Sequence, residues 1–171
     1  PLFVKPAGSG SSYGISKIYK EEELEKAIDF AFTEDNQIVL ESNLEGRELT
    51  CAVFRTKNKI KALPITEIIS ENDFFDYDAK YHGKSREETP AKINDLLANS
   101  IQTLSSEIYE LLGLKSIARI DYIIVDDTPF VIEVNTIPGF SEASIVPQML
   151  KIDGIELKEF WGMIIDQELN N

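Results

Sequence analysis

Apolar and polar positions along the chain divide it into short strands and helices. Alternating or continuous runs of β-branched and aromatic residues predict strands, and apolar residues every three or four positions predict helices. The predicted strands are 1–5, 15–19, 37–41, 48–54, 59–69 with an interruption at Pro64, 117–125 and 129–135. The predicted helices are 21–32, 91–112, 144–150 and 155–169. Strands and helices do not alternate strictly, so we expect an α+β fold, with an antiparallel sheet and flanking helices, rather than a doubly wound sheet.

The last two predicted strands carry the most chemical information. The turn-forming stretch 126–128 joins them into a hairpin. Side chains in a strand alternate between faces, so Arg119 and Asp121 share one face, and so do Glu133 and Asn135. If the turn is centred near Asp127, then Asp121 lies opposite Glu133, and Arg119 lies opposite Asn135.

This register would place two acids, one base and one amide on one patch of an otherwise apolar hairpin. Like charges directly across a strand pair destabilise it, and buried charges are costly without partners. A hard divalent cation with oxygen ligands, such as Mg²⁺ shared with substrate phosphates, would compensate. The alternative is an edge hairpin whose charged face is solvated.

Composition limits the partners of the chain. Its 171 residues include 30 acidic and 17 basic ones, a net charge of −13. This balance disfavours nucleic acid and an anionic membrane surface, although a nucleotide needs only a local basic site. No transmembrane-length apolar run and no signal peptide is visible. Cys51 is the single cysteine, and we interpret it as a small core residue. Because it cannot form an internal disulfide, we expect a cytosolic setting. Because a strand already begins at Pro1, we expect a fragment of a longer protein.

Residues around the first strand could bind a nucleotide. The segment 6–14 contains three glycines and three serines, whose N–H groups and hydroxyls can cradle phosphates. Lys5, just before it, supplies a point charge. An ordinary surface loop beside a solvated lysine is the alternative. The chain has no P-loop motif and no kinase H-R-D or D-F-G motif.

Three other segments add candidates. Glu41, at a strand end, and Glu48, after a glycine turn, can accept hydrogen bonds from a purine amino group or ribose hydroxyls, with a solvated turn as the alternative. The polar segment 71–88 contains Lys80 between two tyrosines. It is interpreted as a lid over a substrate or as a mobile surface loop. His82, the only histidine, is more typical of a surface position.

Together these segments resemble the D-alanine–D-alanine ligases of the ATP-grasp superfamily, over essentially the whole chain. The motifs that carry the resemblance are Phe3-Val4-Lys5-Pro6 with the loop 10–17, Glu41 with Gly46-Arg47-Glu48, the loop 76–81, Ala118-Arg119-Ile120-Asp121, and the segment 133–140. The pair Lys80-Tyr81 fits the dipeptide-forming members rather than those that make D-alanyl-D-lactate.

The resemblance implies a role for each matching residue. The residues that would bind ATP are Lys5, Ser12 and Lys80 at the phosphates, Glu41 at the adenine amino group and Glu48 at the ribose. Those that would hold two Mg²⁺ (or Mn²⁺) ions are Asp121, Glu133 and Asn135. The catalytic residues would be Arg119 and the Gly139 N–H at the acyl phosphate and oxyanion, with Ser11 and Tyr81 closing the lid. Ser144 would bind the carboxylate of the second D-alanine.

The resemblance also implies what the chain does. It would take part in the ATP-dependent ligation of two D-alanines, through an acyl phosphate, for peptidoglycan precursor synthesis in the cytoplasm. Residues 1–43 would be the remnant of a small nucleotide-binding subdomain, and 44–171 the C-terminal subdomain. The missing N-terminal domain of the same protein would be its partner, in a homodimeric parent, and the isolated chain would be inactive. The alternatives are an ATP-grasp ligase of other specificity and a nucleotide-binding module without turnover.

Overall fold

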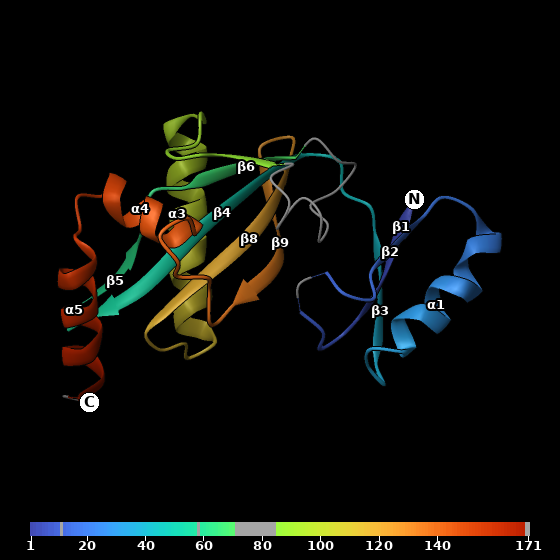
Figure 1. Ribbon diagram of the computed structural model, residues 1–171. Helices are drawn as coiled ribbons and strands as arrows, with labels where there is room; N and C mark the ends of the chain where they lie inside the picture. Colours follow the sequence, from blue (N-terminus) through green and yellow to red (C-terminus); the bar gives the residue numbers. More distant parts are fainter. Residues whose placement is uncertain (11, 58, 71–84, 170–171) are drawn as a thin grey trace. The chain divides into compact units, whose positions relative to one another are not determined.

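The chain forms two compact units. The computed structural model describes residues 1–10, 12–57, 59–70 and 85–169. The first unit contains Pro1–Glu45, and the second contains Gly46–Ile69 with the chain from Arg86 onward (Figure 1). The assignment of 1–43 and 44–171 to two ATP-grasp subdomains stays a prediction.

The first unit is a three-stranded antiparallel sheet with one helix. The strands occur in the order β2-β1-β3. They are β1 (Leu2–Pro6), β2 (Ser16–Ile18) and β3 (Ile38–Ser42). A single 3₁₀ turn, η1 (Glu21–Glu23), leads into α1 (Leu24–Phe32). The small core between helix and sheet consists of Val4, Ile18, Ala27 and Ala31.

The second unit is built on a larger sheet of order β7-β6-β4-β8-β9, with β5 paired to β4. Its strands are β4 (Arg47–Thr56), β5 (Lys59–Ala62), β6 (Thr66–Ser70), β7 (Ser85–Glu88), β8 (Ile117–Val125) and β9 (Thr128–Asn135). Its described helices are α3 (Asp95–Leu111), α4 (Ile145–Ile152) and α5 (Leu157–Leu169). None of the described helices has the length and apolarity needed to cross a membrane.

The two faces of this sheet have different neighbours (Figure 1). On one face, alternate residues of β4 and β8 pack against α3. The buried residues of this core include Leu49, Cys51, Val53, Leu97, Ile101, Tyr109, Ile120 and Tyr122. On the opposite face, Phe54 meets Phe160 of α5 edge to face, with ring centroids 5.2 Å apart. The face that carries Phe54 is also the one to which the polar residues of β8 project.

Several sequence-based boundaries need correction. The helix predicted at 91–112 begins only at Asp95, because the Asn94 side chain accepts a hydrogen bond from the Leu97 N–H (2.8 Å) and caps the first turn. The end of the segment predicted as irregular, Ser85–Glu88, is strand β7. The interruption at Pro64 is confirmed, since β5 and β6 are separate strands.

Helix α3 also buries a narrower stripe than its sequence pattern predicts. The buried residues follow each other at every fourth position: Leu97, Ile101, Ser105 and Tyr109. Leu96 and Leu111 also have the helical spacing of core residues, yet they are 84% and 85% exposed. Ser105 is tolerated in the stripe because its hydroxyl bonds both the Ile101 carbonyl and the Tyr122 hydroxyl at 2.7 Å.

Candidate active site

Strands β8 and β9 form the predicted hairpin, but the turn has two residues rather than three. Asp126 and Asp127 both have positive φ, 48° and 59°, as the central residues of a type I′ turn do. Val125 pairs directly with Thr128. Strand β9 therefore begins one residue earlier than predicted.

A β-bulge in β9 then changes the register halfway along the hairpin. Tyr122 pairs with Val131, whereas the preceding residue of β8, Asp121, pairs with Glu133. Ile132 is therefore an extra residue in β9. An extra residue moves every following side chain of the strand to the other face.

The register at the four polar residues is nevertheless the predicted one. Asp121 pairs with Glu133, and Arg119 pairs with Asn135. The sequence-based prediction reached these pairs through a three-residue turn, and the structure reaches them through a two-residue turn and a bulge. The four side chains consequently share one face of the sheet.

Strand β4, on the other side of β8, brings two more polar residues to this face. Thr50 pairs directly with Asp121. Glu48, two residues before Thr50, shares its face because side chains alternate along a strand. Glu48 was a candidate from the sequence. Thr50 was not, although its spacing from Glu48 within an apolar run was the signal that could have found it.

The Asp121 carboxylate is held by several donors. The residue is 9% exposed. Its Oδ1 accepts hydrogen bonds from Thr50 Oγ1 (2.6 Å) and Arg119 Nε (2.9 Å). Its Oδ2 accepts from Arg119 Nη2 (2.9 Å) and Asn135 Nδ2 (2.8 Å). These bonds compensate for taking a charged group out of water.

Arg119 is held in its charged form. Burial acts to lower the pKa of its guanidinium, but the hydrogen bonds to Asp121 and that residue's charge act in the opposite direction. The negative charges of Glu133 and Glu48 add to this effect, and the net result is a pKa above the ordinary value. The site therefore contains a permanent cation surrounded by acids.

The donors at this face fit a hard divalent cation. Asp121 and the exposed Glu133 face each other across the strand pair. Asn135 uses its amide nitrogen toward Asp121, so its oxygen, the atom that a metal ion binds, is not engaged in that bond. Within the described ranges no three His, Cys, Asp or Glu side chains converge. Two carboxylates and an amide oxygen are a ligand set of the kind Mg²⁺ prefers.

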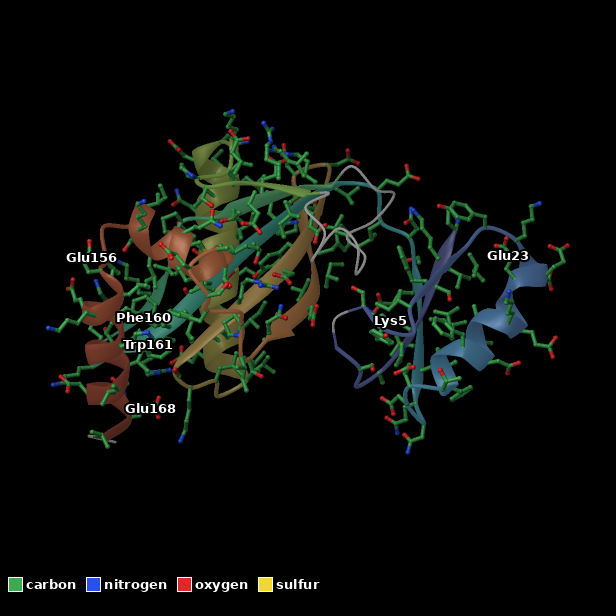
Figure 2. The ribbon with its side chains drawn as sticks, in the orientation of Figure 1. Lys5, Glu23, Glu156, Phe160, Trp161 and Glu168 are labelled. Atoms are coloured by element: carbon green, nitrogen blue, oxygen red, sulfur yellow. The ribbon has the colours of Figure 1, made fainter. Side chains whose placement is uncertain are left out.

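The loop after β9 brings Gly139 and Ser144 together. A Cβ added to Gly139 would lie 3.1 Å from Ser144 Oγ. Ser144 is the N-cap of α4, and its Oγ accepts a hydrogen bond from the Ser141 N–H (3.0 Å). Phe140, beside Gly139, packs against Phe160 and Trp161 of α5, with centroids 5.4 and 4.7 Å away; Figure 2 labels these two partners. Aromatic packing thus anchors the loop that carries the predicted oxyanion donor.

The first unit contains three of the predicted ATP-binding residues. Lys5, labelled in Figure 2, forms an ion pair with Glu41, with Nζ and Oε2 at 2.7 Å. Ser12 lies in the Gly/Ser loop with a positive φ of 59°. The structure therefore brings together the predicted phosphate-binding lysine and the predicted adenine-binding acid. Ser11, Lys80, Tyr81 and His82 lie outside the described residues.

Comparison with known proteins places this geometry in a family. The model of the family described as "D-ala D-ala ligase C-terminus" matches residues 1–166. The D-alanine–D-alanine ligase of Flavobacterium johnsoniae is 48% identical over 169 residues, which are 99% of this chain and 52% of that protein. The chain spans about half the length of the curated relatives that it matches.

Solved structures agree with the sequence relatives. VanG, a D-Ala:D-Ser ligase from Enterococcus faecalis, has a TM-score of 0.85 at 34% identity, covering 98% of this chain and 49% of that one. The D-alanine–D-alanine ligase from Bacillus anthracis complexed with ATP has a TM-score of 0.79 at 29% identity, covering 99% of this chain and 51% of that one. These similarities confirm the predicted α+β, ATP-grasp fold.

Proposed function

Because the chain belongs to the D-Ala–D-Ala ligase C-terminus family, we propose that it forms the nucleotide- and metal-binding half of a ligase that uses ATP to join two D-alanines. One observation supports this most: five chemically suited residues gather on one sheet face. They are Glu48, Arg119, Asp121, Glu133 and Asn135. A binding module without turnover would not require a permanently charged arginine beside the metal ligands.

In this proposal Asp121, Glu133 and Asn135 hold two Mg²⁺ or Mn²⁺ ions. The ions, when bound, neutralise charge on the β- and γ-phosphates of ATP. The ladder pairing of Asp121 with Glu133 fixes the spacing of the two carboxylates. Thr50 orients the Asp121 carboxylate from the neighbouring strand.

Arg119 neutralises the acyl phosphate formed from the first D-alanine. Together with the Gly139 N–H it stabilises the negative oxygen that develops when the second D-alanine attacks. Ser144 binds the carboxylate of that second D-alanine. Its place at the N-terminus of α4 supports this role, because the first N–H groups of a helix have no partner within the helix and the helix dipole favours an anion there.

Lys5 and Ser12 bind the ATP phosphates, Glu41 binds the adenine amino group, and Glu48 binds the ribose. Ser11, Tyr81 and Lys80 keep the roles that the resemblance implies, lid closure for the first two and a phosphate contact for the last. The product serves peptidoglycan precursor synthesis in the cytoplasm. We further propose that the parent protein is a homodimer. We also propose that the 171 residues alone do not synthesise the dipeptide, because the matching relatives are about twice as long.

Calorimetric titration of the 171-residue chain with Mg-ATP tests this proposal. We expect weak binding that is lost in Asp121→Asn and in Glu133→Gln. Glu110→Gln is the matched control, since it removes the same charge from an exposed position on α3. Binding that survives both site variants would contradict the assignment. In a longer protein that contains this chain, ATP hydrolysis should require D-alanine.

A substrate other than D-alanine at the second position can be tested directly, because VanG, named as a D-Ala:D-Ser ligase, matches with a TM-score of 0.85. In the longer protein, the products formed from D-alanine with equimolar D-serine or D-lactate can be separated by chromatography. We expect D-alanyl-D-alanine to dominate. Predominant formation of either mixed product would assign the other specificity.

A further inference from the structure

The Asp121 carboxylate has no acceptor position left for a metal ion. A carboxylate offers about four lone-pair sites. Four protein donors use them: Thr50 Oγ1 and Arg119 Nε on Oδ1, and Arg119 Nη2 and Asn135 Nδ2 on Oδ2. A cation that binds Asp121 must therefore displace at least one of these donors.

Arg119 is the donor most easily displaced by a cation. Thr50 is fully buried, and its bond of 2.6 Å is the shortest of the four. Asn135 is uncharged, and its side chain also donates to the Arg119 carbonyl at 3.4 Å. Among the donors that the structure describes, Arg119 alone carries a positive charge, so an arriving divalent cation repels it while competing for the same two oxygens.

We propose that Arg119 is a stand-in cation. It occupies the Asp121 carboxylate until a divalent cation binds there, and the cation then releases the guanidinium toward the reacting phosphate. The inference rests on the proposed function, because the cation is the one assigned to Asp121 and Glu133. Binding of the metal ion and release of the Arg119 guanidinium from Asp121 would thus occur together. A guanidinium that is always charged stays paired with an acid until the metal arrives.

The first test measures Mn²⁺ affinity of the full 171-residue chain by electron paramagnetic resonance. Arg119→Ala removes the competitor, so we expect Mn²⁺ to bind on the order of tenfold more tightly than in the unmodified chain, a typical scale for changes around metal ligands. Arg55→Ala is the matched control: it removes the same charge from another residue of the sheet, one that pairs with Glu110. The gain should vanish in the double variant Arg119→Ala/Glu133→Gln. Unchanged or weaker binding in Arg119→Ala, including no binding by either protein, overturns the proposal.

A second measurement needs no variant and covers the case in which Arg119→Ala does not fold. The Arg119 Nε–H, held at 2.9 Å from Asp121 Oδ1, gives a proton signal that Mg²⁺ should shift or bring into fast exchange with water. Arg119→Lys identifies the signal by its loss. A signal that stays unchanged at saturating Mg²⁺ overturns the proposal. The metal site itself is judged separately, by loss of Mn²⁺ binding in Asp121→Asn.

Discussion

Replacing Thr50 by valine tests whether a buried hydroxyl holds the Asp121 carboxylate in place. The two side chains have nearly the same shape, so the substitution leaves no cavity. It removes the 2.6 Å hydrogen bond to Oδ1 from a position that is 0% exposed. Water cannot easily replace the lost donor there. Asp121 itself is 9% exposed and would keep three of its four bonds.

The expected cost follows from the charge of the acceptor. A hydrogen bond to an ionised group contributes about 1.5–3 kcal/mol, against about 0.5–1.5 kcal/mol for a neutral pair. We therefore expect Thr50→Val to lower the free energy of unfolding by about 2 kcal/mol. The matched control is Thr66→Val. Thr66 is also 0% exposed, but its hydroxyl bonds another hydroxyl, that of Thr89, at 2.6 Å.

Urea unfolding followed by the fluorescence of Trp161, the only tryptophan, reports on the unit that contains both threonines. The predicted result is a larger loss for Thr50→Val than for Thr66→Val, by about 1 kcal/mol. If the two losses are equal, or if Thr66→Val is the more damaging, then the bond to Asp121 is not charge-assisted and Thr50 does not position the carboxylate.

Three further outcomes are expected. Burial raises the pKa of the Cys51 thiol from 9.0 to about 12. The folded state therefore favours the neutral thiol, and this contribution to stability is fully present below pH 9 and is lost as the pH rises toward 12. Urea unfolding between pH 9 and 12 should show a decline in the free energy of unfolding, and Cys51→Ala should make that decline smaller. Gly46→Ala should destabilise the chain by about 1–3 kcal/mol, because a Cβ at this position would lie 2.1 Å from the Ile124 carbonyl oxygen. Gly162→Ala on α5 is the control: nothing lies within 4 Å of its Cβ, so thermal melts should show a neutral or stabilising effect. Asn94→Ala should cost about 1 kcal/mol in the same melts through loss of the α3 cap, and Asn94→Asp, which retains an acceptor, should largely restore it.

The sequence was sufficient to predict the described strands and helices other than β7, and the face that carries the site. Period-two alternation places Arg119 with Asp121, and Glu133 with Asn135, whatever the turn. The resemblance to a ligase family could be found from short contiguous motifs, which do not depend on how the chain folds. The family model supports it over residues 1–166. Strand β8 has the predicted bounds because its apolar run ends in two aspartates that favour a tight turn.

What the sequence could not supply depends on contacts between elements. Thr50 resembles an ordinary strand residue until β8 brings Asp121 opposite it. Strand β7 is polar and short, and only its pairing with β6 makes it a strand. Leu96 has the spacing of a core residue, yet the stripe that α3 buries lies to one side of it. Similarly, the pairing of Lys5 with Glu41 requires β1 and β3 to be neighbours.

The bulge at Ile132 gives the hairpin tolerance to changes in length. If Asp127 were deleted, Asp126 and Thr128 would form the two-residue turn, and Val125 would pair with Pro129. Regular pairing from there reaches Tyr122 opposite Ile132 and Asp121 opposite Glu133 without any bulge. A chain one residue shorter at the turn could therefore keep Asp121 paired with Glu133 and Arg119 paired with Asn135. The length of the turn can thus change without changing the register at the four polar residues.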